Sequence, residues 1–229
     1  MRNLIAPVFI VFCLLLPASG QSQERIELGD GSELTVFLVR PSETTQSPAP
    51  LVILMGGGSG NASISRDTSI WLGGGFASRG WMVAVPVSPN NRAFRGSSNN
   101  DKVRQLADVL TARADIADGK VLLAGISNGG ISALEIARRD PSRYVGVAAV
   151  PAVTSSVSDN EPLAGFPVYL RIGGEDELGW AERYEETVTT LESAGVELDA
   201  ELFDGQRHMF RMDWYSLEPW LEKITASDQ

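Results

Sequence analysis

Apolar segments of strand length recur along the chain, and segments with helical periodicity separate them. This alternation constrains the fold more than any other feature. Strands that are apolar on both faces are typical of parallel sheets covered by helices on both sides. The pattern therefore predicts an α/β fold with a mostly parallel central sheet. The apolar segments are LVILM (51–55), WMVAVPV (81–87), KVLLAGI (120–126), YVGVAAVPAV (144–153) and PVYLRI (167–172).

Two other segments are predicted to extend this sheet. The segment RIELGDGSELTVFLVRP (25–41) contains the turn dipeptide Asp-Gly and favours an N-terminal antiparallel hairpin. The segment ELDAELF (197–203) alternates polar and apolar residues, which predicts a half-exposed strand near a sheet edge. Among the helices, we expect Asp101 to cap the one that follows residue 100. Pro219 should lie in the first turn of the last helix, where proline is tolerated.

The first twenty residues have the layout of a secretory signal peptide. Arg2 precedes an apolar core, residues 4–16, and small residues follow at 18–20. That core is shorter than the roughly 20 residues needed to cross a bilayer, although an uncleaved membrane anchor is the alternative. We therefore expect a signal peptide at 1–20 and a single domain at 21–229. The mature protein would be secreted or periplasmic, without stable membrane insertion.

Charge and cysteine content exclude several classes of function. The net charge is −10, and loss of Arg2, the one charged residue of the signal, would make it −11. Such an acidic chain is a poor partner for nucleic acid. The single cysteine, Cys13, would leave with the signal, and the chain has one histidine, so we expect no disulfide, metal or cofactor. The oligomeric state is left open.

The pentapeptide Gly125-Ile126-Ser127-Asn128-Gly129 fits the pattern Gly-x-Ser-x-Gly. It follows an apolar strand and precedes a helix-forming segment, which is the context that this motif requires in hydrolases. A serine at so tight a turn needs glycine neighbours, because strand and helix backbones crowd against it. We predict that Ser127 is a nucleophile and that the Asn128 N–H helps to stabilise an oxyanion. The alternative is a plain glycine-rich turn.

Three consecutive glycines follow the first buried strand, in LMGGGSG (54–60). In hydrolases of this architecture the loop at this place supplies the second oxyanion donor, and we predict Gly57 and Gly58 for that role. A phosphate-binding loop is the alternative. It would need Lys-Ser/Thr after the glycines, whereas Asn61 and Ala62 follow here, and the glycine spacing does not fit a dinucleotide site well.

The general base and the acid are predicted from their places after later strands. His208 is the sole histidine and lies in DGQRHMF (204–210), between the last strand and the last helix. The loop RIGGEDELGW (171–180) offers Glu175, Asp176 and Glu177, of which we choose Asp176. The order serine, acid, histidine is the order described for α/β-hydrolases.

Five stretches of the chain resemble the α/β-hydrolase superfamily, and within it the small dienelactone hydrolase-like and phospholipase/carboxylesterase-type members. The resemblance implies that Ser127, Asp176 and His208 are nucleophile, acid and base. Many relatives have histidine before the glycines, where this chain has Met55. The matching stretches cover nearly all of the mature chain: LVILMGGGSG, FASRGWMVAVPV, VLLAGISNGGISAL, VYLRIGGEDEL and FDGQRHMF.

The expected function is hydrolysis of carboxylic esters through an acyl-enzyme. The segment TSSVSDNEPLAGF (154–166) has room for a loop only, so the lid is minimal and small or soluble esters are favoured as the small-molecule partner. The alternatives are a serine peptidase or thioesterase on the same fold, and a binding protein that kept the fold without catalysis.

Overall fold

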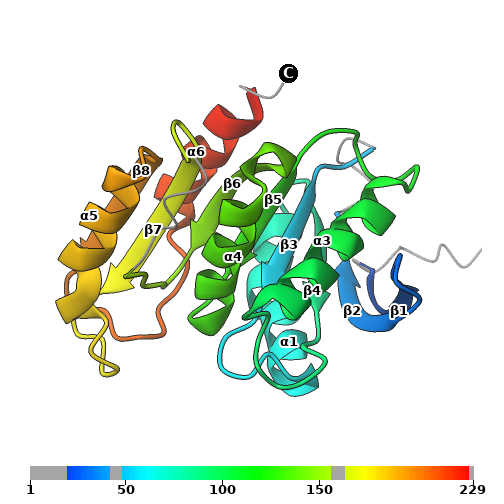
Figure 1. Cartoon of the computed structure of the whole chain (residues 1–229), viewed down its shortest axis with the longest axis horizontal. Coiled ribbons are helices and arrows are strands. Elements are labelled where there is room, and N and C mark those ends of the chain that lie inside the picture. Colours follow the sequence, from blue (N-terminus) through cyan, green and yellow to red (C-terminus); the bar gives the residue numbers. More distant parts are fainter. Residues whose placement is uncertain (1–19, 42–47, 156–162, 227–229) are drawn as a thin grey trace, which may run out of the picture.

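The computed structural model describes residues 20–41, 48–155 and 163–226 (Figure 1). The predicted signal peptide, except for Gly20, lies outside the described residues, and so does most of the predicted minimal-lid loop 154–166. Within the described ranges, no helix combines the length and the apolar character that crossing a membrane would require.

Eight strands form one sheet in the described part of the chain, in the order β1-β2-β4-β3-β5-β6-β7-β8. The pairs β1–β2 and β2–β4 are antiparallel, and all other neighbours are parallel. The predicted mostly parallel sheet with an N-terminal hairpin is confirmed. The strands are β1 Gln21–Glu27, β2 Glu33–Val39, β3 Leu51–Met55, β4 Met82–Pro86, β5 Val121–Gly125, β6 Tyr144–Ala149, β7 Pro167–Gly173 and β8 Glu197–Phe203.

Helices cover both faces of the sheet. Figure 1 shows α3, α4 and α5 over one face, where their buried side chains join those of the strands in one apolar cluster. The other face packs against α2 and α6 in a second cluster. The helices are α1 Ala62–Thr68, the π-helix η1 Ser69–Gly73, α2 Gly74–Ala77, α3 Ser97–Thr111, α4 Asn128–Arg139, the 3₁₀ helices η2 Pro141–Arg143 and η3 Ala181–Arg183, α5 Tyr184–Ser193 and α6 Trp214–Ala226.

The burial of each strand explains its place in the sheet. Every residue of the inner strands β3, β4, β5 and β6 is buried, because helices cover both faces. Strand β8 instead alternates exposed and half-buried residues and lies at the edge, as its sequence predicts. The strands that precede the candidate site residues therefore all belong to the parallel part of the sheet, and β8, which leads to His208, is its half-exposed edge strand.

Two helices begin earlier than predicted. Helix α3 starts at Ser97, so Asp101 lies inside the helix and does not cap it. Helix α6 starts at Trp214, so the prediction that Pro219 lies in the first turn is wrong. The side chain of Asp213 accepts hydrogen bonds from the Tyr215 N–H (3.1 Å) and from the Ser216 hydroxyl (2.6 Å). The bond from the Tyr215 N–H satisfies one of the backbone donors that a helix start leaves unpaired, so the helix begins here, well before Pro219.

The topology brings four loops to one edge of the sheet. Parallel strands have their carboxyl ends at the same edge, where ligand sites of such sheets form. The glycine loop follows β3, Ser127 follows β5, Asp176 follows β7 and His208 follows β8. Segments far apart in the sequence are therefore neighbours there.

Candidate active site

Ser127 occupies a strained turn between β5 and α4. Its φ is 55° and its ψ is −121°, a combination that residues with a side chain rarely adopt. Strain of this kind costs about 1–3 kcal/mol and persists only where the surroundings enforce it. Hydrogen bonds do so here, because the Ser127 N–H donates to the Pro151 carbonyl (2.8 Å) and the Ile126 N–H donates to the Met55 carbonyl (3.1 Å).

The glycines around Ser127 are there because backbones touch at this turn. A Cβ atom on Gly129 would lie 2.1 Å from the Met55 carbonyl oxygen, and one on Gly125 would lie 2.3 Å from the Gly129 carbonyl carbon. A Cβ atom on Gly130 would lie 2.7 Å from the Pro151 carbonyl oxygen. These contacts are with main-chain atoms that cannot rotate away. The sequence Gly-x-Ser-x-Gly-Gly is therefore a packing requirement of this strand–turn–helix junction.

Three side chains from three loops form a hydrogen-bonded series at this edge. His208 Nε2 lies 2.9 Å from Ser127 Oγ, and His208 Nδ1 lies 2.7 Å from Asp176 Oδ2. All three residues are buried. The tautomer that carries its proton on Nδ1 can donate it to a carboxylate oxygen of Asp176, which accepts. In the neutral ring Nε2 is then the acceptor for the Ser127 hydroxyl, which is the arrangement that a general base needs.

The loops that hold Asp176 and His208 are tied to each other. Asp176 Oδ1 accepts the Leu178 N–H (2.8 Å), and Glu177 accepts the backbone N–H of His208 (2.9 Å). That bond from His208 holds the pKa of Glu177 below its usual value, helped by Arg207. A Cβ atom on Gly173 would lie 2.2 Å from the Arg207 carbonyl oxygen, so the two loops pack main chain to main chain.

The three neighbouring acids therefore have different surroundings. The Asp176 side chain is fully buried against the imidazole, whereas Glu175 and Glu177 are exposed. Glu177 anchors the backbone of His208 rather than its ring. Of the three, only Asp176 contacts the histidine ring in a way that could orient it.

The glycine loop lies directly against Ser127. A Cβ atom on Gly57 would lie 3.3 Å from Ser127 Cβ and 3.2 Å from the Ile126 carbonyl oxygen. The Asn128 side chain donates to the Gly58 carbonyl oxygen (2.9 Å), and Gly58 has a φ of 54°. The structure thus brings together the residues that sequence analysis proposed for oxyanion binding. The Gly58 carbonyl accepts from Asn128, and Gly57 is the glycine that packs against Ser127.

A family model described as the dienelactone hydrolase family matches residues 89–218. The chain belongs to this family. The match spans more than half of the chain and includes Ser127, Asp176 and His208. The protein is therefore a hydrolase of α/β fold. A comparison with curated proteins gave no match.

Solved structures with the same fold include enzymes of several kinds. Acetyl xylan esterase from Aspergillus awamori is 12% identical, with a TM-score of 0.68 over 88% of this chain and 99% of that one. A dienelactone hydrolase-like promiscuous phosphotriesterase from metagenomic libraries is 14% identical, with a TM-score of 0.65 over 90% and 97%. Porphyromonas gingivalis dipeptidyl peptidase 4 is 16% identical, with a TM-score of 0.67 over 92% of this chain and 36% of that longer one. At these identities the likeness shows the fold alone.

One contact in this dienelactone hydrolase family member was not found from its sequence. Trp180 packs edge-on against the His208 ring, with centroids 4.8 Å apart and an interplanar angle of 89°. Its place at the end of the acidic loop was the available signal. Met55, the departure noted before the glycines, is fully buried in the core, so only its backbone carbonyl takes part in the turn.

A pocket of about 500 Å³ opens beside the imidazole. It lies on the face of the sheet that α2 and α6 cover, and His208 and Ile126 belong to its wall. The full lining is Trp71, Leu72, Ile126, Val150, Pro151, His208, Met209, Phe210, Arg211, Met212 and Trp214.

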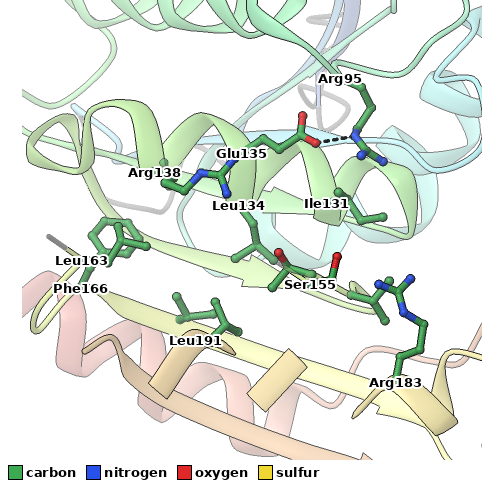
Figure 2. A pocket seen from close by; sticks show the side chains of 14 residues that line it. Arg95, Ile131, Leu134, Glu135, Arg138, Ser155, Leu163, Phe166, Arg183 and Leu191 are labelled. Atoms are coloured by element: carbon green, nitrogen blue, oxygen red, sulfur yellow. Dashed lines mark hydrogen bonds and ion pairs between the residues drawn. The ribbon is translucent and has the colours of Figure 1, made fainter. Parts of the chain in front are cut away.

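A second pocket, of about 200 Å³, lies on the other face, between α4 and α5 (Figure 2). Figure 2 shows Arg95 paired with Glu135 at its rim, at 2.7 Å. Its lining includes none of Ser127, Asp176 and His208, so it is separate from the candidate site. No group of three or more His, Cys, Asp or Glu side chains in the described ranges is arranged to hold a metal ion.

Proposed function

We propose that the protein is a serine hydrolase that cleaves carboxylic esters of small or soluble substrates through an acyl-enzyme. The observation that carries this proposal is the hydrogen-bonded series from Ser127 Oγ through both ring nitrogens of His208 to Asp176. Serine is a weak nucleophile until a positioned base takes its proton, and this geometry supplies the base and its orienting acid.

The acylation step uses the described contacts directly. His208 Nε2 takes the proton of Ser127 as Oγ bonds to the ester carbonyl carbon, giving a tetrahedral intermediate. Asp176 stabilises the positive imidazole that forms. His208 then gives the proton to the alcohol oxygen as the bond from that oxygen to the acyl carbon breaks. The alcohol leaves, and the acyl group stays on Ser127.

The intermediate needs donors for its negative oxygen. The backbone N–H groups of Asn128, at the start of α4, and of Gly57 are the proposed donors. The amino end of a helix carries partial positive charge, which favours an anion at this place. Each such donor is worth about 3 kcal/mol of barrier lowering in comparable enzymes. Water, activated by His208, then attacks the acyl carbon and releases the acid.

A substrate panel tests the proposal against the peptidase and thioesterase alternatives. We expect hydrolysis of p-nitrophenyl esters, and little or no hydrolysis of aminoacyl nitroanilides or acyl thioesters at equal concentration. The measurement is kcat/KM for each class with purified mature protein. Faster turnover of the anilides or thioesters would assign the site to one of those alternatives, and absence of all turnover would favour a binding protein.

We also propose that the chain is exported, to the periplasm or the outside of the cell, after removal of residues 1–20. The apolar core 4–16, followed by the small residues Ala18-Ser19-Gly20, supports this. Expression of the full chain with a C-terminal tag should give a mature protein whose N-terminal sequence begins after Gly20. A protein that keeps Met1 and sediments with membranes would show instead that the segment is an anchor.

A further inference from the structure

The pocket beside His208 is built to hold an apolar group. We propose that it binds the apolar part of the ester substrate, an aryl or medium-length alkyl group, and that Trp214 sets how large that group can be. This inference rests on the proposed esterase function and adds a substrate class to it. The pocket's volume of about 500 Å³ is in the range of small-molecule sites.

The chemistry of the lining favours a neutral apolar ligand. Nine of its eleven residues are uncharged and carry aliphatic, thioether or aromatic side chains. The other two are His208, which is the proposed base, and Arg211, which is exposed. Ile126 immediately precedes Ser127, and His208 Nε2 lies 2.9 Å from Ser127 Oγ, so two residues of the pocket wall adjoin the nucleophile. The pocket is therefore within reach of an apolar group on an ester held at Ser127.

Two exposed apolar side chains line the same pocket. Trp71 is 83% exposed and Met209 is 63% exposed, and both line the pocket. A gathering of exposed apolar groups marks a place where apolar ligands bind. In the described part of the chain, the exposed large hydrophobic side chains are Ile70, Trp71, Leu178, Met209 and Tyr215.

Trp214 lines the pocket, and its ring is fixed by contacts on the side away from the pocket. Its ring packs edge-on against Phe76, with centroids 5.1 Å apart, and the Arg79 guanidinium lies 4.1 Å above it. Arg79 is itself fixed by Glu218, at 3.1 Å. A Cβ atom on Gly75 would lie 2.2 Å from Trp214 Cζ2. The absent side chain at Gly75 is therefore what lets the indole occupy its present position.

This arrangement supplies a matched pair of variants. In Gly75→Ala the new methyl group must displace the indole, which changes the shape of the pocket without touching Ser127, Asp176 or His208. Gly74→Ala adds the same methyl group one residue earlier in α2, where nothing lies within 4 Å of the new atom. Both substitutions raise helix propensity equally, so a difference between them reports on Trp214.

The experiment measures kcat/KM over two ester series. The first lengthens the acyl chain from acetate to decanoate on one alcohol, and the second lengthens the alcohol on acetate. In one of the two, the wild-type protein should gain about fourfold per buried methylene and then level off. Gly75→Ala should lower the ratio of the best long ester to the shortest ester by about tenfold or more, and Gly74→Ala should leave that ratio unchanged.

Each outcome decides the proposal. A flat profile in both series, or equal ratios in the two variants, would overturn it. If Gly75→Ala does not fold, Trp214→Phe decides, because a smaller ring should move the plateau to longer esters and an unmoved plateau would overturn the proposal. Labelling of Ser127 by a small fluorophosphonate tests the esterase function separately. If the protein is labelled but its kcat/KM does not vary with chain length, the proposed esterase function stands and the proposed role of the pocket is wrong.

If the fluorophosphonate does not label Ser127, the proposed function is wrong, and the apolar pocket is then tested by ligand binding alone. The probe is 2-decanone, a ketone that cannot be hydrolysed, with tryptophan fluorescence as the readout. Saturable quenching that Gly75→Ala weakens and Gly74→Ala does not would support the apolar pocket. No quenching in the wild-type protein would overturn it.

Discussion

Ser127→Ala is expected to lower kcat for ester hydrolysis by about 10⁴- to 10⁶-fold. The substitution removes the only atom that contacts His208 Nε2 in the series, at 2.9 Å, so no acyl-enzyme can form. Any residual rate would come from direct attack of water on the bound ester, with the N–H groups of Asn128 and Gly57 stabilising the negative oxygen that forms. The measurements are kcat for a p-nitrophenyl ester and covalent labelling by a fluorophosphonate, which should be lost completely.

Ser142→Ala is the matched control. Ser142 is exposed in η2, at the amino end of β6 and therefore at the opposite edge of the sheet from the site. It should keep wild-type kcat and labelling. A thermal melt of both variants verifies that they fold. If Ser127→Ala retained labelling and a near wild-type rate, another residue would be the nucleophile and the proposed mechanism would be wrong.

Asp176→Asn should lower kcat by about 10⁴-fold. The change keeps the size of the side chain but replaces an accepting oxygen, 2.7 Å from His208 Nδ1, by an amide that can also donate. The amide can then stabilise the tautomer with the proton on Nε2, and that tautomer cannot accept the Ser127 proton. The positive imidazole also loses the negative charge that stabilises it. Steady-state kcat near neutral pH measures the combined loss.

Two neighbouring acids serve as controls for Asp176. Glu175→Gln changes an exposed side chain and should leave kcat within about twofold of wild type. Glu177→Gln weakens a bond to the His208 backbone rather than to its ring, so its effect should be much smaller than that of Asp176→Asn. A loss in Glu177→Gln as large as in Asp176→Asn would mean that the acid is assigned to the wrong residue.

The sheet was predictable because its signal is local. The fully buried strands β3 to β6 read as unbroken apolar runs, and the alternation of Leu198, Ala200 and Leu202 placed β8 at an edge. Helix starts were less predictable. The first turn of α3 contains the buried residues Asn99 and Asn100, whose side chains donate to the Ala93 (3.3 Å) and Phe94 (2.6 Å) carbonyl oxygens. From the sequence alone such a turn reads as a polar loop, because the partners of its buried amides are known only from the folded structure.

The sequence by itself determined the fold family, the serine turn and the order in which its candidate partners follow successive strands. Periodicity and glycine placement express these, because they act between residues close in the chain. The choice of Asp176 over its two acidic neighbours had no physical ground in the sequence, because the three carboxylates share one chemistry. Only the tertiary structure shows which of them the β7 loop buries against His208. It alone assembled the pocket from the segments 71–72 and 209–214 and set Gly75 behind Trp214. Contacts between segments so far apart depend on the paths of several loops, which no local pattern specifies.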